Sequence, residues 1–172
     1  MSLLRTATPI ALALIILAAC APRSLTADEP RTPDQPQATF DATAISLLSA
    51  VNQARGSGAT CSADYYPPVS ALSLEPRLVR TAQLHTADMV SKAYFSHTGS
   101  DGSSVSQRVT RQGYEWRAVG ENIAYGQRSV EQVVEAWMNS PSHCRAIMDS
   151  EFTELGAARV EDHWTLVFGT PR

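Results

Sequence analysis

The sequence has no concentrated positive charge and lacks several motifs that familiar enzyme classes require. No cluster of Lys and Arg is longer than a pair, and the formal net charge is −3, so nucleic acid is not expected as a partner. No Gly-x-Ser-x-Gly segment is present, which argues against the nucleophile elbow of an α/β-hydrolase. The chain has three cysteines and no Cys-x-x-Cys pair, which excludes the usual dithiol redox motif and a cysteine-based zinc knuckle.

The chain also lacks any apolar run long enough to span a membrane, and its one apolar segment lies near the N-terminus. Arg5 precedes an apolar stretch over residues 10–16, and Leu-Ala-Ala then leads to Cys20. A spanning helix needs about 20 apolar residues, so we predict an export signal over residues 1–19. The Leu-Ala-Ala-Cys ending resembles the lipobox of bacterial lipoproteins, in which the cysteine is acylated. Cys20 is therefore the expected lipidation site and the link to a membrane, the alternative being an ordinary signal peptide cleaved near Ala19.

The segment that follows the signal predicts a tether. Residues 20–40 combine the cysteine with a polar stretch that contains four prolines and almost no apolar residues. Such a segment cannot bury enough surface to offset its ordering entropy. Residues 41–172 have the usual size of one domain. We expect an extracytoplasmic protein anchored to the cell envelope. Because Ala21 replaces the aspartate that retains some lipoproteins at the inner membrane, an outer membrane facing the periplasm is favoured in a Gram-negative envelope.

Cys61 and Cys144 remain as an even pair once Cys20 is assigned to lipid. In an oxidising compartment a disulfide is the default for such a pair, and two free thiols are the alternative. Closing a loop of this length would stabilise the domain by up to ~4–5 kcal/mol in the chain-entropy model. The bond would join the loop after the first helix to the helix that carries His143.

Apolar spacing and turn residues predict helices mixed with strands. Ile45, Leu48 and Val51 mark the expected buried face of the first helix, and Ser140 is the expected N-cap of the last one. Helices are expected over 41–56, 76–93 and 104–112 and from 129 and 141 onward, and strands over 119–125, 155–160 and 164–168, with a loop over 61–68. The two terminal strands form a hairpin, which predicts an α+β fold with α-β-α layering.

Two further histidines have structural interpretations. His85 falls on the apolar face of the helix predicted over residues 76–93, where we expect it to pack and to satisfy one backbone group. His163 falls in the polar turn between the terminal strands, where we expect it to be solvated. Neither is predicted as a ligand.

Four short segments concentrate the reactive side chains in a fixed order. They read YFSHTGSDGSS (94–104), GENIAYG (120–126), WMNSPSHC (137–144) and FTELGAA (152–158). Together they resemble the bacterial form of the CAP superfamily, named for cysteine-rich secretory proteins, antigen 5 and pathogenesis-related proteins of class one. The resemblance covers residues 41–169 and implies an α-β-α sandwich with a cleft lined by two histidines and two acidic residues.

The resemblance identifies three of the four cleft residues. His97 and His143 match the two histidines, and Glu121 matches the first glutamate. Ser140 stands where many eukaryotic members have the second glutamate, and a serine cannot replace a carboxylate. The complete four-residue site is therefore not carried over to this chain.

Two imidazoles and a carboxylate predict a divalent metal site, with zinc as the first candidate. His97, His143 and Glu121 would leave positions open for water or a ligand. In the alternative interpretation the same residues form a hydrogen-bond network that fixes the cleft walls, with Glu121 accepting from an imidazole N–H.

We expect a binding module for a small or lipidic ligand, because the resemblance implies lipid or sterol binding by some members. Most members have no established catalytic activity, so an enzyme is the less favoured hypothesis. A metal-assisted hydrolase with Glu121 as general base is the first alternative. A structural or adhesive envelope protein that uses only its surface is the second.

Overall fold

A computed structural model describes residues 40–172, so the predicted signal, Cys20 and nearly all of the tether lie outside the described residues. The helices are α1 (Ala42–Ser57), α2 (Pro76–Ser91), α3 (Val105–Arg111), α4 (Val130–Met138) and α5 (Pro141–Met148). The strands are β1 (Ala59–Cys61), β2 (Asp64–Tyr66), β3 (Ser73–Leu74), β4 (Trp116–Tyr125), β5 (Glu154–Val160) and β6 (His163–Pro171). No helix in this range is long and apolar enough to cross a membrane.

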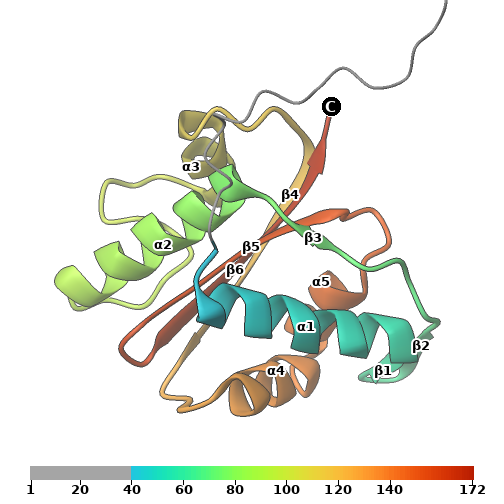
Figure 1. Ribbon diagram of the computed structural model, residues 1–172. Helices are drawn as coiled ribbons and strands as arrows, with labels where there is room; N and C mark the ends of the chain where they lie inside the picture. Colours follow the sequence, from blue (N-terminus) through green and yellow to red (C-terminus); the bar gives the residue numbers. More distant parts are fainter. Residues whose placement is uncertain (1–39) are drawn as a thin grey trace, which may run out of the picture. The chain divides into compact units, whose positions relative to one another are not determined.

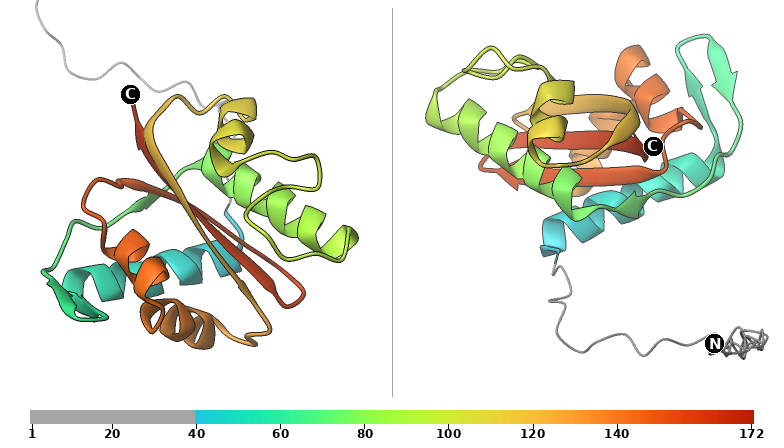
Figure 2. Two further views of the ribbon diagram at one scale, coloured as in Figure 1. Left: turned by 180° about the vertical axis from the view of Figure 1, so that it is seen from behind. Right: turned by 90° about the horizontal axis from the view of Figure 1, so that it is seen from above.

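The main sheet has the strand order β3-β5-β6-β4 and is covered by helices on both faces (Figures 1 and 2). Only β3 and β5 run parallel; the other neighbours are antiparallel. Alternate residues of β5 and β6 enter two separate cores because strand side chains alternate between faces. Leu166 packs with α1, α4 and α5, whereas Val167 packs with α2 and α3. The predicted α+β class and α-β-α layering are confirmed.

The first helix begins where predicted, but its buried face is rotated from the predicted one. Asp41 caps it, because its carboxylate accepts a hydrogen bond from the Ala44 backbone N–H at 2.7 Å. Ala44, Leu47 and Val51 are fully buried, whereas Ile45 is 53% exposed. The predicted burial of Ile45 is therefore wrong, whereas Val51 is buried as predicted and Leu48 packs against the core as a partly buried residue. Packing of the helix on the sheet decides which residues face inward, and local spacing alone does not fix that rotation.

Arg55 ties α1 to the end of α5. Its guanidinium is fully buried and donates to four backbone carbonyls, a role that the sequence analysis missed. Burial lowers the Arg55 pKa, and the nearby Asp149 carboxylate opposes that effect. The accepting oxygens belong to Ser70 (2.8 Å), Ile147 (2.6 Å), Asp149 (2.9 Å) and Phe152 (3.2 Å).

The segment after α1 is not the irregular loop that its prolines predict. It contains a short antiparallel hairpin of β1 and β2, whose turn places Ser62 at a φ of 64°. The predicted disulfide is confirmed: Cys61 is bonded to Cys144, with 5.5 Å between their Cα atoms. The bond fastens the hairpin to α5, directly beside His143.

Close packing of α2 against the sheet fixes the helix that precedes the candidate site. At Gly156 on β5, an added Cβ would lie 2.0 Å from the Leu78 carbonyl carbon. Only glycine therefore allows the two backbones to approach this closely. The loop that carries His97 follows directly after the C-terminal end of α2.

Candidate functional site

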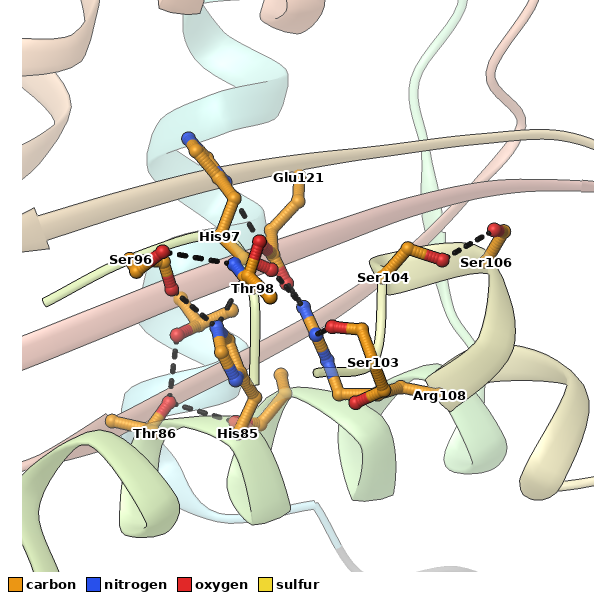
Figure 3. A network of polar contacts seen from close by, with 12 residues as sticks. His85, Thr86, Ser96, His97, Thr98, Ser103, Ser104, Ser106, Arg108 and Glu121 are labelled. Atoms are coloured by element: carbon orange, nitrogen blue, oxygen red, sulfur yellow. Dashed lines mark hydrogen bonds and ion pairs between the residues drawn. The ribbon is translucent and has the colours of Figure 1, made fainter. Parts of the chain in front are cut away.

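Glu121 lies at the centre of a polar network between β4, α3 and the loop after α2 (Figure 3). Its side chain is only 2% exposed. One carboxylate oxygen, Oε1, lies 2.9 Å from His97 Nδ1, and the other, Oε2, accepts from Arg108 Nη2 at 2.7 Å. Both oxygens are thus engaged, and the buried negative charge is balanced by a guanidinium.

Arg108 is the residue of this network that the sequence analysis missed. It lies on α3, which begins at a capping box formed by Ser104 and Gln107. Its guanidinium also donates to the backbone carbonyls of Ser103 (2.7 Å) and His97 (3.1 Å). Arg108 therefore both neutralises Glu121 and holds the His97 loop. The sequence offered one sign of this role, because Arg108 precedes the buried Val109 on the inward face of a short helix.

His97 is fixed by one ring nitrogen and exposed at the other. Its side chain is 58% exposed, and Glu121 accepts a hydrogen bond from Nδ1–H. The carboxylate therefore selects the tautomer in which Nε2 carries a lone pair. Figure 3 shows the second ring nitrogen pointing away from Glu121. His97 thus presents an oriented acceptor at the surface.

His143 lies in the first turn of α5, close to His97. Asn122 on β4 donates to the His143 backbone carbonyl at 3.1 Å, which couples the strand to the helix. Burial lowers the His143 pKa, and the neighbouring His97 lowers it further. His143 is therefore neutral at pH 7, as a metal ligand or hydrogen-bond acceptor must be. The structure thus brings His97 and Glu121 into direct contact, with His143 nearby.

His85 contributes to the network from α2. The prediction for it is confirmed: its side chain is fully buried on α2, and Nε2 lies 3.0 Å from the Ser96 carbonyl oxygen. The same nitrogen is 3.8 Å from Glu121 Oε1. Burial lowers its pKa, so the ring is neutral and Nε2–H donates to the carbonyl. His85 thereby fixes the residue that precedes His97.

Two residues near the site had structural predictions. Ser140 is the N-cap of α5 as predicted, although its side chain makes no capping hydrogen bond. Pro141 supplies the fixed φ that starts this helix, so the cap contributes less. The prediction for His163 is wrong, because this residue is half-buried at the start of β6 rather than solvated in a turn. Its ring centroid lies 4.6 Å from that of Tyr125 and 6.3 Å from that of Phe95.

Glu121 is placed to support a metal-bound His97 rather than to act as a ligand itself. Among residues 40–172, no three His, Cys, Asp or Glu side chains converge closely enough to enclose a metal ion. Glu121 is already held by Arg108 and His97. A metal-bound histidine commonly donates its other ring N–H to a carboxylate, which is the contact observed here. His97 and His143 could therefore hold a metal, with Glu121 orienting His97 from behind.

Comparison with known proteins identifies relatives across most of the described chain. The family model described as CAP, cysteine-rich secretory protein family, matches residues 48–168. The Bacillus subtilis (strain 168) uncharacterized protein YkwD is 36% identical over 99 residues, which is 56% of this chain and 38% of that protein. The uncharacterized membrane protein YlbC of the same strain is 33% identical over 84 residues, or 49% and 24%. The match thus spans well under half the length of either relative.

Solved structures share the fold at low sequence identity. An extracellular Bacillus anthracis protein containing an SCP domain gives a TM-score of 0.65 at 22% identity, covering 83% of this chain and 45% of that one. An outer surface protein of Borrelia burgdorferi gives 0.57 at 24% identity, covering 60% and 80%. A Staphylococcus aureus cysteine-rich secretory protein gives 0.56 at 15% identity, covering 76% and 40%.

Proposed function

This chain belongs to the cysteine-rich secretory protein (CAP) family, and from that premise we propose that it is an extracytoplasmic, envelope-anchored binding module. Its cleft would hold a small or lipidic ligand at the exposed Nε2 of His97 and the neutral imidazole of His143. The observation that supports this proposal most directly is the hydrogen bond between His97 Nδ1 and Glu121, which fixes the His97 ring and leaves Nε2 free to contact a ligand. Preorganised acceptors of this kind suit binding, since little ordering entropy is lost when a ligand arrives.

The state of Glu121 argues for binding over hydrolysis. A general base needs a free lone pair within reach of the proton that it removes. Glu121 Oε1 accepts from His97 and Oε2 from Arg108, and because the side chain is only 2% exposed, its remaining lone pairs are shielded from a proton in the cleft. The carboxylate thus suits the support of a binding wall better than proton abstraction. A metal-assisted hydrolase would need this network to open.

A divalent ion such as zinc is compatible with this cleft as a component of the ligand site. His97 and His143 would hold it, and Glu121 would support His97. When bound, the ion would supply a positive centre for a carboxylate or phosphate group of the ligand. The neutral state of His143 favours such binding at pH 7, since a protonated imidazole cannot ligate.

Anchoring through acylated Cys20 and the 20–40 tether would keep the cleft beside a membrane, where lipidic ligands are concentrated. Replacing Cys20 by serine tests this part separately. In cells fed a labelled fatty acid, the wild-type protein should carry label and sediment with membranes. C20S should carry none and appear in the soluble fraction, whereas equal labelling and sedimentation of both would overturn the anchoring proposal.

Native mass spectrometry of the mature chain, residues 20–172 with C20S, tests the cleft. The zinc-loaded or the lipid-exposed sample should show an adduct that the metal-free sample lacks. H97A and H143A should lose the adduct, whereas H163Q, a histidine outside the cleft, should retain it. Absence of every adduct from the folded protein, or adducts unaffected by H97A and H143A, would refute the proposal. An unchanged cellular phenotype in the H97A/E121Q/H143A variant would favour a surface or adhesive role instead.

The alternative hypothesis, that the protein is a hydrolase, has its own test. A panel of ester and peptide substrates should show no turnover above the H143A background. Turnover by the wild-type protein that H143A abolishes, without loss of the folded circular dichroism spectrum, would replace the binding proposal with the hydrolase.

A further inference from the structure

A pocket with an aromatic lining lies where the C-terminal end of α2 comes close to the turn between β5 and β6 (Figure 1). Its volume is about 380 Å³, within the usual range of small-molecule sites, about 300–1,000 Å³. Tyr94 and Phe95 line it from the loop after α2, and Tyr125 and His163 line it from β4 and β6. None of the three cleft residues of the proposed function is part of this lining, so the pocket is a separate feature.

Three rings of the lining form one cluster that is open to solvent. The side chains of Phe95 and Tyr125 are 50% and 59% exposed. Tyr125 and His163 are cross-strand partners whose ring centroids lie 4.6 Å apart, and the Phe95 centroid lies 6.3 Å from each of them. Scattered apolar residues are normal on a protein surface, whereas a contiguous exposed patch marks a place of contact with another molecule.

Two residues of the lining adopt a backbone conformation that favours glycine. Ala93 and Glu161 both have a φ of 52°, and among residues 40–172 only one other non-glycine residue has a left-handed φ. Glu161 is the first residue of the two-residue turn between β5 and β6, a position at which Asn, Asp or Gly is preferred. Such unfavourable conformations cluster at functional sites. A glutamate at this position indicates a role for its side chain in the pocket rather than in the turn.

The charge of the lining favours a cation. Of the described residues that line the pocket, Glu161 is the one acid, and none is a lysine or arginine. Glu161 takes part in none of the ion pairs among residues 40–172, whereas its neighbour Asp162 pairs with Arg159 at 3.9 Å. The Tyr94 hydroxyl donates to Asp88, which leaves the Tyr94 ring for contact with a ligand. Aromatic rings beside an unpaired carboxylate are complementary to a positive charge.

The arrangement of the rings indicates which kind of cation fits. The planes of Phe95, Tyr125 and His163 are tilted against one another by 47°, 54° and 50°. A sugar ring stacks on a flat platform, which tilted rings do not provide, whereas a compact, rounded group can contact several tilted rings at once. A cation is attracted to an aromatic ring within about 6 Å of its centroid. A quaternary ammonium needs no hydrogen bonds, so an aromatic lining suits it better than it suits a strongly hydrated ammonium ion.

We propose that this pocket binds a small quaternary ammonium compound of the choline type. The trimethylammonium group lies against the rings of Phe95 and Tyr125, with the Glu161 carboxylate beside it. A free choline and the headgroup of a phosphatidylcholine present the same group, and the experiment separates these two sources. The proposal does not depend on the proposed function, since the pocket can be occupied whether or not the cleft binds metal or lipid.

Calorimetric titration of the mature chain (residues 20–172, C20S) at pH 8 tests the proposal. The probes are choline, glucose and 3,3-dimethylbutan-1-ol, which has the shape of choline without its charge. Choline should bind saturably, the uncharged alcohol should bind about tenfold more weakly, and glucose should not bind. Flotation with phosphatidylcholine vesicles identifies the source of the group. Vesicle binding that free choline competes away assigns the lipid headgroup, whereas choline binding without vesicle binding assigns the soluble compound.

Matched variants separate the contribution of the rings from that of apolar area. F95L and Y125L keep an apolar side chain but remove the ring, so each should weaken choline binding about fivefold or more. Y125F keeps the ring and should retain the wild-type affinity. E161Q should weaken binding by about twofold to fivefold, because an exposed charge contributes little in water.

Three control variants lie outside the pocket. Tyr65 is 67% exposed on β2, so Y65L should leave choline binding unchanged, and so should E135Q on the exposed face of α4. H97A/H143A should also retain it, which separates this pocket from the cleft.

The proposal is overturned if choline does not bind saturably, if the uncharged alcohol or glucose binds as tightly as choline, or if Y125L and Y65L behave alike. Zinc adducts measured on the same samples report on the cleft alone. A failure of choline binding with intact zinc adducts would thus refute only the aromatic pocket.

Discussion

At the scale of single residues, the site depends on how one buried carboxylate is neutralised. Glu121 would be costly to bury alone, but the Arg108 guanidinium supplies both a positive charge and a hydrogen-bond donor. The same guanidinium reaches the His97 carbonyl, so charge balance and loop position depend on one side chain. Changes at Glu121 should therefore affect stability as well as binding.

The substitution E121Q should lower the free energy of unfolding by about 3 kcal/mol, because it leaves the Arg108 charge buried and unpaired. Urea denaturation followed by tryptophan fluorescence would measure the loss. The control is E135Q, which removes a carboxylate from the exposed face of α4 and should change stability by less than about 0.5 kcal/mol. Equal stability of the two variants would contradict a structural role for the Glu121–Arg108 pair.

The histidines predict how stability depends on pH. Burial holds the pKa values of His85 and His143 below the ordinary value of 6.5 in the folded protein. As the pH falls through about 6.5, the unfolded chain takes up these protons while the folded chain does not. The free energy of unfolding should therefore fall between pH 7.5 and 5.

Urea denaturation at several pH values tests this dependence. In H143Q one of the two groups is missing, so the decrease below pH 6.5 should be shallower than in the wild-type protein. A stability that rises on acidification in this range would contradict the assignment.

At the scale of secondary-structure elements, α2 controls the candidate site through its contact with β5. Helix and strand backbones meet at Gly156, and the helix then positions His85 and the loop bearing His97. Local sequence predicted this helix well, because Pro76 and an apolar stripe define its start and inner face. The need for glycine on the facing strand arises only from the contact between the two elements.

The substitution G156A should destabilise the domain by about 3 kcal/mol or more, because the new methyl group would overlap the Leu78 backbone, which cannot rotate away. Gly56 provides the matched control, since a Cβ there meets nothing within 4 Å and the residue lies in α1. G56A should instead stabilise the protein by about 0.5–1 kcal/mol. Thermal denaturation of both variants would measure the difference, and a neutral G156A would contradict the close approach.

At the scale of the whole molecule, the Cys61–Cys144 bond spans 83 residues and connects the start of the domain to α5. The double variant C61S/C144S should lose up to about 4 kcal/mol, because the unfolded chain regains the entropy of an open loop. Chemical denaturation would measure this loss. C20S, which removes the third cysteine, should leave the stability unchanged. Equal stability of C61S/C144S and the wild-type protein would show that the disulfide contributes nothing.

The sequence by itself determined those properties that depend on local spacing, residue type and counting. The α+β class, most element positions, the cysteine pairing and the placement of His85 were predicted correctly, because caps, turns and apolar periods act within a few residues. The motifs around His97, Glu121 and His143 identified the CAP family. Acylation of Cys20 stays a prediction, since that residue lies outside the described part of the chain.

Tertiary structure alone decided which groups meet across long sequence separations. Arg55 binds carbonyls more than 90 residues away, and Arg108 balances Glu121 from another element. The choice of Ala44 over Ile45 as a buried residue and the unpartnered His85 Nδ1 likewise depend on how helices pack on the sheet. No local pattern encodes these contacts, because they depend on the relative positions of elements that only the assembled core brings together.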